Sequence, residues 1–219
     1  MTARLLCLLL GYFCGSVQSG YLIGRLKGID IRNYGSHSTG ATNSLRVMGP
    51  AAGAAVLAGD ILKALIPCFA VRWLFRDQPD VQYLMVLWTA VGVILGHDYP
   101  FYLGFRGGKG VASTIGVFAA VSVPAGLMWG AVFLTVVFIT KYVSLSSICA
   151  MTFLAVFIIL CFFRGALPVS GDHALEYMIL ALVIPLLSIW RHRSNVGRLM
   201  RGEESRLDLF TKGMKTGRK

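Results

Sequence analysis

Repeated long apolar runs constrain this chain more than any other feature. Only 14% of its 219 residues are charged, whereas a soluble domain averages roughly 25%, so polar surface is too scarce to cover a globule. A helix needs about 20 mostly apolar residues to cross a bilayer. The pattern predicts an all-α membrane protein, a helical bundle formed by 1–219 as a single domain. The apolar runs lie at 4–25, 51–75, 82–104, 111–140, 143–163 and 174–190.

The first run also has features of a secretory signal, because Arg4 precedes a continuous apolar stretch. However, apolar character continues through residues 21–24, and no small-residue cleavage site stands out. We therefore expect a retained first span.

The run at 111–140 is too long for one helix, and Pro124 interrupts it. Basic residues favour cytoplasmic loops. If 111–123 and 125–140 are two short spans, the loop 26–50 and the basic tail lie on the same side of the membrane. The charges therefore predict seven spans, with the N-terminus outside and the C-terminus in the cytoplasm. This topology brings every polar, glycine-rich stretch to the cytoplasmic face: 35–46, 104–110, 144–147 and 192–206.

The net charge of +11 raises the possibility of nucleic-acid binding, but the charges are unevenly placed. Nine of the 21 Lys and Arg residues lie between Arg191 and Lys219, directly after the last apolar run. A basic segment beside a membrane helix usually contacts anionic headgroups. We expect contact with membrane lipid and no nucleic-acid partner.

The cysteines and histidines do not indicate a metal site. No CxxC pair occurs, the cysteines lie in or beside apolar runs, and the histidines are scattered. We expect no metal and no disulfide. The cysteines are Cys7, Cys14, Cys68, Cys149 and Cys161.

The first polar segment combines glycines, hydroxyls, an amide and an arginine. Glycines allow backbone N–H groups to approach an anion, and hydroxyl and guanidinium groups supply further donors. An ordinary polar loop at the membrane interface would have a similar composition. The candidate residues are Ser36, Gly40, Thr42, Asn43 and Arg46.

The second polar segment is a glycine-rich turn that runs into an apolar stretch. Such a helix start presents unpaired N–H groups and a positive dipole end, which suit phosphate. It is not a Walker loop, because Gly110 follows Lys109 where Ser or Thr is required. We expect a phosphate site to which Arg106 also contributes, and a flexible linker is the alternative. The other candidates are His97, Gly107 and Gly108.

The third segment follows the last apolar run. His192, Asn195 and Arg198 share one face at helical spacing, and Glu204 follows. A solvated basic tail is an equally good interpretation of these residues alone.

Two further polar groups lie within apolar runs. Asp60 and Lys63 are spaced to pair on one helix face, and charges at that depth normally pair or line a polar cavity. We expect a structural ion pair that also supports the site. Ser144, Ser146 and Ser147 are expected to cap the start of the sixth span.

Together the three segments resemble the acyl-phosphate-dependent glycerol-3-phosphate acyltransferases of bacteria. The resemblance rests on Gly35-Ser-x-x-x-Gly40-Ala-Thr-Asn43-x-x-Arg46, Gly107-Gly-Lys-Gly-Val111 and Asn195-x-x-Arg198-Leu-x-x-Gly202-x-Glu204, with the lead-in Gly15-Ser-x-x-x-Gly20-Tyr-Leu-Ile-Gly24-Arg25. It covers nearly the whole chain. One departure is that His37 and Ser38 stand where the family usually has Gly and Asn.

The resemblance implies seven spans in the bacterial inner membrane, with the active site at the cytoplasmic face. It implies transfer of an acyl group from acyl phosphate to the 1-hydroxyl of sn-glycerol 3-phosphate, giving lysophosphatidic acid and inorganic phosphate, without a cofactor. The partners would be the two substrates and membrane lipid, and we expect a monomer. A small membrane transporter or channel for phosphorylated solutes is the alternative.

Under this interpretation, the expected catalytic residues are Ser36, Arg46, Lys109, His192 and Asn195. The proton acceptor stays open among His97, His192 and a substrate phosphate oxygen. Asp60 and Lys63 would support the site. The expected substrate-binding residues are Gly40, Thr42, Asn43, His97, Gly107, Gly108, Gly110, Ser144, Arg198 and Glu204.

Overall fold

The computed structural model describes residues 1–207, all of whose regular structure is helical. Six segments are long and apolar enough to cross a membrane, and α6 is a shorter apolar helix. The protein is therefore an all-helical membrane protein. The elements are α1 Thr2–Ser16, α2 Ser19–Leu26, η1 Ile31–Asn33, α3 Ala41–Met48, α4 Pro50–Leu74, α5 Pro79–Asp98, η2 Phe101–Leu103, α6 Val111–Val121, α7 Val123–Thr140, α8 Val143–Phe163, η3 Gly171–His173, α9 Ala174–Arg191 and α10 Arg193–Met200.

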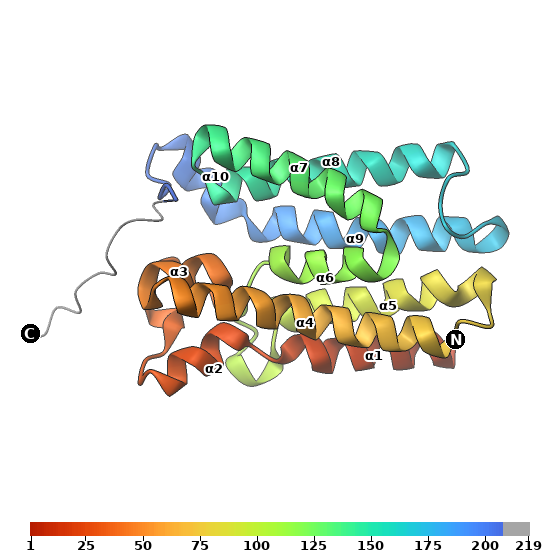
Figure 1. Cartoon of the computed structure of the whole chain (residues 1–219), viewed down its shortest axis with the longest axis horizontal. Helices are drawn as coiled ribbons and strands as arrows, with labels where there is room; N and C mark the ends of the chain where they lie inside the picture. The colour runs from red at the N-terminus through yellow and green to blue at the C-terminus, as the bar shows by residue number, and fades with distance from the viewer. Residues whose placement is uncertain (208–219) are drawn as a thin grey trace, which may run out of the picture.

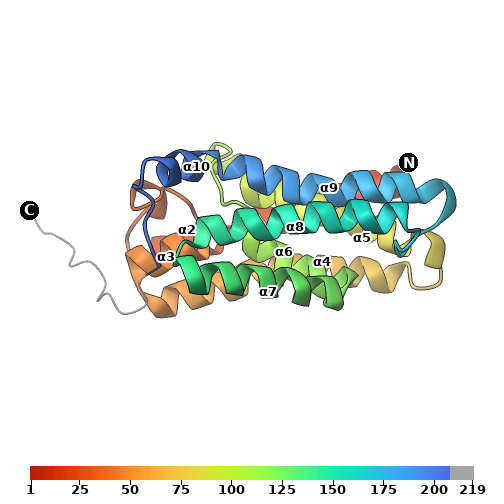
Figure 2. The same cartoon turned by 90° about the horizontal axis from the view of Figure 1, so that it is seen from above.

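The long helices run side by side along the bundle, and α5 lies at its centre (Figures 1 and 2). Helix α5 packs against α1, α4, α6 and α9, and most of its residues are buried. Helix α7 has the opposite character, because only Ala125 and Trp129 on it are buried. An apolar helix with so little burial is typical of one that faces lipid.

Glycines bring α1 into close contact with α5. A Cβ atom at Gly11 would lie 2.0 Å from the carbonyl oxygen of Thr89, and one at Gly15 would lie 2.1 Å from that of Val93. Gly92 and Gly96 of α5 approach the α1 backbone equally closely. Small residues at four-residue spacing let membrane helices approach in this way. This contact fixes α1 against α5 along Gly11 and Gly15.

The first apolar run is not one continuous helix. Helix α1 ends at Ser16 and α2 begins at Ser19, where the expectation was an unbroken span over 4–25. Gln18 fills the break: its side-chain amide donates to the carbonyl of His97 at 3.1 Å and accepts from the hydroxyl of Thr39 at 2.7 Å. Through these two hydrogen bonds, Gln18 connects the end of α5 to the first polar segment.

The fourth run divides at Ser122 and not at Pro124. Ser122 caps α7 by accepting from the amide of Ala125, and Pro124 lies in the first turn of α7. Proline is tolerated there because the first N–H groups of a helix have no partner within it. The two halves are therefore Val111–Val121 and Val123–Thr140, in place of 111–123 and 125–140.

The polar segments gather at one end of the bundle. Helices α2, α3 and α10 and the start of α8 lie at this end, and the connections from α4 to α5 and from α8 to α9 lie at the other (Figures 1 and 2). We call the first end the polar end. The N-terminus lies at the opposite end (Figure 1).

Candidate active site

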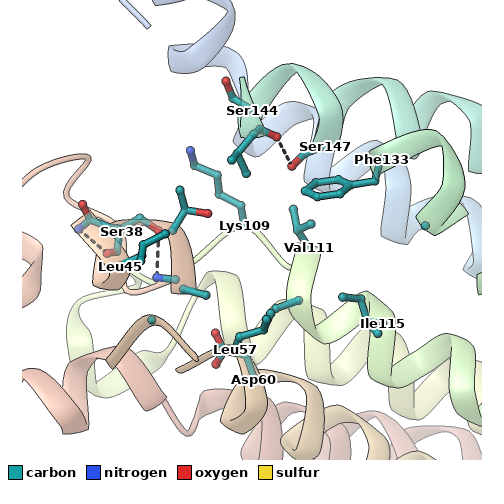
Figure 3. Close-up of a pocket in the computed structure, with 18 of the residues that line it drawn as sticks. Ser38, Leu45, Leu57, Asp60, Lys109, Val111, Ile115, Phe133, Ser144 and Ser147 are labelled. Carbon is teal, nitrogen blue, oxygen red and sulfur yellow. Dashed lines mark hydrogen bonds between the residues drawn. The ribbon is translucent and has the colours of Figure 1, made fainter. Parts of the chain in front are cut away.

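A cavity of about 690 Å³ opens at the polar end between α3, α4, α6, α7, α8 and α10. We call it the site cavity. Residues from all three predicted motifs line it, together with apolar side chains of α4, α6 and α7 (Figure 3). Lys63, Gly107, Gly108, Gly110 and Arg198 do not line it. The predicted site residues that do are Ser36, Gly40, Thr42, Asn43, Arg46, Asp60, His97, Lys109, Ser144, His192, Asn195 and Glu204.

Lys109 projects into this cavity from the loop that precedes α6 (Figure 3). Its amine donates a hydrogen bond to Oδ1 of Asn195 on α10. Burial lowers the pKa of Lys109 to about 8, and the positive charges of Arg198, Arg191 and Arg46 add to this effect. A lysine that is partly desolvated and still charged at neutral pH is a strong hydrogen-bond donor to a bound anion.

The Gly107–Gly110 turn is held by its neighbours. The amides of Gly107 and Gly108 donate to the carbonyls of Asp98 and His97 at 3.2 and 3.0 Å. We expected these two amides to face a phosphate, but both are already bonded. A Cβ atom at Gly108 would lie 1.9 Å from Nε2 of His97, so no other residue fits there without a shift.

Arg191 was missed by the sequence analysis. Its guanidinium donates to the carbonyls of Gly108 at 2.8 Å and Gly107 at 3.4 Å, and its Nε lies 4.0 Å from the Asp98 carboxylate. Arg106, which we expected to converge on the phosphate site, is exposed and lines no part of the site cavity. Arg191 follows an apolar run directly, and only its contact with the glycine loop distinguishes it from the other basic residues of the tail.

Glu204 organises the third motif. It accepts hydrogen bonds from the Asn195 amide at 2.8 Å, the Ser144 hydroxyl at 2.8 Å and Nε of Arg198 at 2.7 Å. Burial opposes its ionisation, but these three donors outweigh burial and lower its pKa. Arg198 thus forms a salt bridge with Glu204, and Glu204 in turn orients Asn195 toward Lys109.

The serines at the start of α8 do not cap it. The N-cap residue is Tyr142, and no side chain accepts from the first amides. Ser146 and Ser147 donate to the carbonyls of Tyr142 and Val143, each 2.8 Å away, and Ser144 donates to Glu204. The prediction was wrong because these serines already lie within the helix, where a hydroxyl finds the carbonyl one turn earlier.

His192 is buried between the end of α9 and the start of α10. Its Nδ1 lies 2.7 Å from the carbonyl oxygen of Ser188, and a carbonyl only accepts, so Nδ1 carries the proton. Burial lowers its pKa to about 4, and Lys109 adds to the effect. At neutral pH His192 is therefore uncharged, with Nε2 as an acceptor.

Asn43 holds the first motif in shape. Its Oδ1 accepts from the amide of Ser36 at 2.9 Å, and its Nδ2 donates to the carbonyls of Tyr34 at 3.0 Å and Ser38 at 2.9 Å. These bonds occupy the side chain, so Asn43 organises the loop that presents Ser36. Asn43 also lines the site cavity, and direct contact between Asn43 and substrate stays a prediction.

His37 stands where the resembled family usually has glycine, and its φ of 57° lies in the left-handed region that favours glycine. Its Nδ1 bonds to the carbonyl of Arg32 at 2.9 Å, and its side chain lies outside the site cavity. Ser38 does line the cavity.

Arg46 completes the cationic side of the site cavity. Its guanidinium donates to the carbonyl of Ser205 at 3.1 Å. Its pKa is lowered, mainly by burial and further by Arg198, although Glu204 opposes the shift. Arg46 and Lys109 thus both bring positive charge to this end of the site cavity.

Asp60 and Lys63 form the predicted ion pair at 2.9 Å inside α4. The Lys63 amine also contacts the carbonyl of Val17 and Nδ1 of His97, each at 2.7 Å. Because Nδ1 of His97 accepts this bond, Nε2 carries the proton and is a donor. His97 therefore offers no free acceptor to the site cavity in this arrangement. Asp60 Oδ2, in contrast, has no partner among the described residues.

The rest of the site cavity is apolar. Val111, Ile115 and Phe118 of α6 lie on one helix face at helical spacing. Val111 and Ile115 line the cavity together with Leu57 of α4 and Phe133 of α7 (Figure 3). We call this part the acyl groove. It leads from Lys109 into the interior of the bundle.

Within residues 1–207, no three His, Cys, Asp or Glu side chains gather where they could hold a metal ion. All five cysteines are free. The polar groups that line the site cavity are an amine, a guanidinium, amides, hydroxyls, imidazoles and carboxylates.

Comparison with known proteins places these residues in context. Residues 5–202 match the family model described as glycerol-3-phosphate acyltransferase. Glycerol-3-phosphate acyltransferase 2 of Thermotoga maritima is 40% identical over 203 residues, which cover 92% of this chain and 95% of that protein. Glycerol-3-phosphate acyltransferase of Shouchella clausii is 42% identical over 203 residues, covering 91% and 93%.

The fold also matches solved structures. The glycerol 3-phosphate form of PlsY, an integral membrane glycerol 3-phosphate acyltransferase, superposes with a TM-score of 0.80 at 35% identity, covering 94% of this chain and 96% of that one. The lysophosphatidic acid form of PlsY gives 0.77 at 34% identity, with the same coverage.

Proposed function

Because the chain belongs to the glycerol-3-phosphate acyltransferase family, we propose that it acylates the 1-hydroxyl of sn-glycerol 3-phosphate with acyl phosphate as donor. The new ester bond forms between that hydroxyl oxygen and the acyl carbon, and the bond between the acyl carbon and the phosphate oxygen breaks. The products are 1-acyl-sn-glycerol 3-phosphate and inorganic phosphate. Family membership makes the protein a membrane acyltransferase of phospholipid biosynthesis. The acyl phosphate donor, the 1-hydroxyl as acceptor and the release of inorganic phosphate are what we propose.

One observation carries the proposal: a single cavity joins the cationic group of Lys109 and Arg46 to the apolar acyl groove. Both proposed substrates carry phosphate, and one also carries a fatty chain. A charge-assisted contact at Lys109 and Arg46 would hold the phosphates, and the groove would hold the chain. Ser36, presented by the Asn43-held loop, supplies a hydroxyl on the same wall.

The site supports direct transfer. Among the described residues, no serine or cysteine side chain lies within hydrogen-bond distance of a histidine ring, so no activated nucleophile is assembled. Acyl phosphate is already activated, and the remaining need is to align the hydroxyl with the acyl carbon and to neutralise the leaving phosphate. Lys109, fixed by Asn195, is placed for the second task.

The proton of the attacking hydroxyl needs an acceptor. His97 offers no free acceptor, and His192, with a pKa of about 4, is a weak base at neutral pH. A phosphate monoester has a second pKa near 6, which is closer to neutral pH. We therefore assign the proton to a substrate phosphate oxygen, with Nε2 of His192 orienting the hydroxyl.

The proposed orientation places the polar end in the cytoplasm of a bacterial inner membrane, with the N-terminus outside. Helix α6 is too short to cross alone, but with its preceding loop it completes a seventh crossing between α5 and α7. Water-soluble glycerol 3-phosphate would enter from the polar end, and the fatty chain from lipid beside the exposed helix α7. One chain supplies all of the site, so the enzyme would act as a monomer and a single domain.

A comparison of donors tests the proposal. Purified protein in lipid nanodiscs is incubated with glycerol 3-phosphate and either palmitoyl phosphate, palmitoyl-CoA or palmitoyl acyl carrier protein, and acylated product is measured. We expect product only with palmitoyl phosphate. Equal turnover with either thioester would refute the proposed donor. Glycerol 3-phosphate uptake into proteoliposomes without product would favour the transporter alternative.

A further inference from the structure

A second cavity of about 260 Å³ lies beyond the acyl groove. Its walls come from α5, α6, α7, α8 and α9 and from the loop at 166–168, and most of them are apolar. Among its lining residues are Leu87, Leu154 and Ile184. It shares no polar residue with the site cavity. A mostly apolar cavity of this size can accept an apolar guest.

Phe118 is the one residue that lines both cavities. Its side chain is 8% exposed, and it lies at the end of the Val111, Ile115, Phe118 face of α6 that forms the groove. At 1.5 Å rise per residue, the groove wall from Val111 to Phe118 is about 10 Å long. The site cavity continues past Phe118 to Ala119, Val123 and Leu127, so the ring of Phe118 lies in the groove wall, between the groove and the second cavity.

The neighbours of Phe118 keep it in that position. A Cβ atom at Gly126 of α7 would lie 2.8 Å from Cβ of Phe118 and 3.2 Å from its Cγ, so α7 packs directly against this side chain. The Trp129 ring lies 5.8 Å from the Phe118 ring, and Phe133 stacks on Trp129 at 5.5 Å. Aromatic contacts of this kind restrict the rotamer of each ring.

We propose that Phe118 is an end stop between the acyl groove and the second cavity, and that it limits the longest acyl chain held inside the bundle by closing off the second cavity. This inference rests on the proposed function, because the guest is the fatty chain of the acyl donor. Continuity carries it: the groove begins at Lys109, where the donor phosphate would bind, and passes Phe118, the one described residue that lines both the groove and the second cavity. Removal of the ring joins the two spaces and lengthens the groove.

The test uses four variants in nanodiscs. Phe118→Ala joins the cavities, and Phe118→Leu opens them less and guards against loss of folding. Val117→Ala is the matched control, because Val117 lines only the second cavity and its truncation leaves the end stop in place. Phe118→Ala combined with Ala181→Leu refills the second cavity, which Ala181 lines.

The first readout needs no turnover. The melting temperature of each protein is measured with saturated alkyl phosphates from decyl to octadecyl. For the starting protein and Val117→Ala, the rise in melting temperature should level off at the same alkyl chain length. For Phe118→Ala the rise should continue to longer chains. For Phe118→Ala combined with Ala181→Leu it should level off at about the chain length seen for the starting protein. The same limit in all proteins, or a gain that never levels off in the starting protein, overturns the end stop.

The second readout is kcat/KM for saturated acyl phosphates of increasing length. Beyond the original limit, Phe118→Ala should gain about fourfold per additional methylene over the starting protein. If no protein turns over acyl phosphate but the melting series shows the shifted limit, the proposed function fails and the end stop stands. If turnover is normal and its length limit is unchanged in Phe118→Ala, the end stop is refuted.

Discussion

The amine of Lys109 donates a hydrogen bond to Oδ1 of Asn195, which joins the glycine loop before α6 to helix α10. Asn195 donates in turn to Glu204, which also holds Ser144 and Arg198. The second and third motifs are thus one hydrogen-bonded unit. The Lys109 amine of this unit lines the site cavity and is positioned by residues far apart in the sequence.

Lys109→Ala should abolish transfer and leave the protein folded. Loss of a preorganised charged donor at a leaving group costs about a thousandfold in rate. The side chain of Lys109 forms one hydrogen bond, to Asn195, so we expect its removal to leave the bundle folded. Arg106→Ala is the control, because Arg106 is exposed and should keep full activity. Turnover with acyl phosphate and melting temperature are measured together. Retained activity in Lys109→Ala refutes the anion-site role.

The pH profile should show the titration of Lys109. The active form is the protonated amine, and its pKa of about 8 means that kcat/KM falls as pH rises through 8. Lys109→Arg should move this alkaline limb upward, because a guanidinium stays charged. Rates are measured from pH 6 to 10 at subsaturating substrate. A flat profile across that range contradicts the assignment.

Asp60→Asn should chiefly impair folding or expression. It leaves the Lys63 amine buried without its carboxylate, and breaking a buried pair in this way costs about 3–5 kcal/mol. Asp60→Asn with Lys63→Met removes both charges and should recover much of the yield and melting temperature. A well-expressed but inactive Asp60→Asn would instead show that Asp60 acts in catalysis, through its unpartnered Oδ2.

Gly108→Ala should lower both activity and stability, because the new methyl group would collide with the His97 ring. Overpacking of this kind typically costs about 1–3 kcal/mol. Gly197→Ala on α10 is the control: its Cβ atom would meet only the flexible end of Arg201 at 3.4 Å. The melting temperatures of the two variants are compared. Equal melting temperatures would mean that the loop can shift at no cost.

The apolar runs and charge bias predict the all-helical membrane fold well, because lipid imposes the same length and polarity on each span. The division of the fourth run is predicted only approximately, since proline fits equally well in the first turn of α7 and at a break. The interruption at Gln18 is not visible in the sequence. It depends on the carbonyl of His97 and the hydroxyl of Thr39, which approach only in the folded bundle.

Residue types and spacing in the sequence predict which residues belong to the site better than they predict the role of each residue. Asn43 is of a residue type that often binds substrates, but both polar atoms of its side chain form hydrogen bonds within the loop that presents Ser36. Arg106 and Arg191 are chemically alike, and only packing determines which one holds the glycine turn. Such choices depend on contacts between distant segments, which local pattern does not encode.

The most direct test of the central claim is a mass balance. Purified protein in nanodiscs converts palmitoyl phosphate and glycerol 3-phosphate, while acylated product and inorganic phosphate are measured over time. The proposed reaction predicts equal amounts of 1-acyl-glycerol 3-phosphate and phosphate, with neither formed by Lys109→Ala. Phosphate release without acylated product, or equal product from Lys109→Ala, would contradict it.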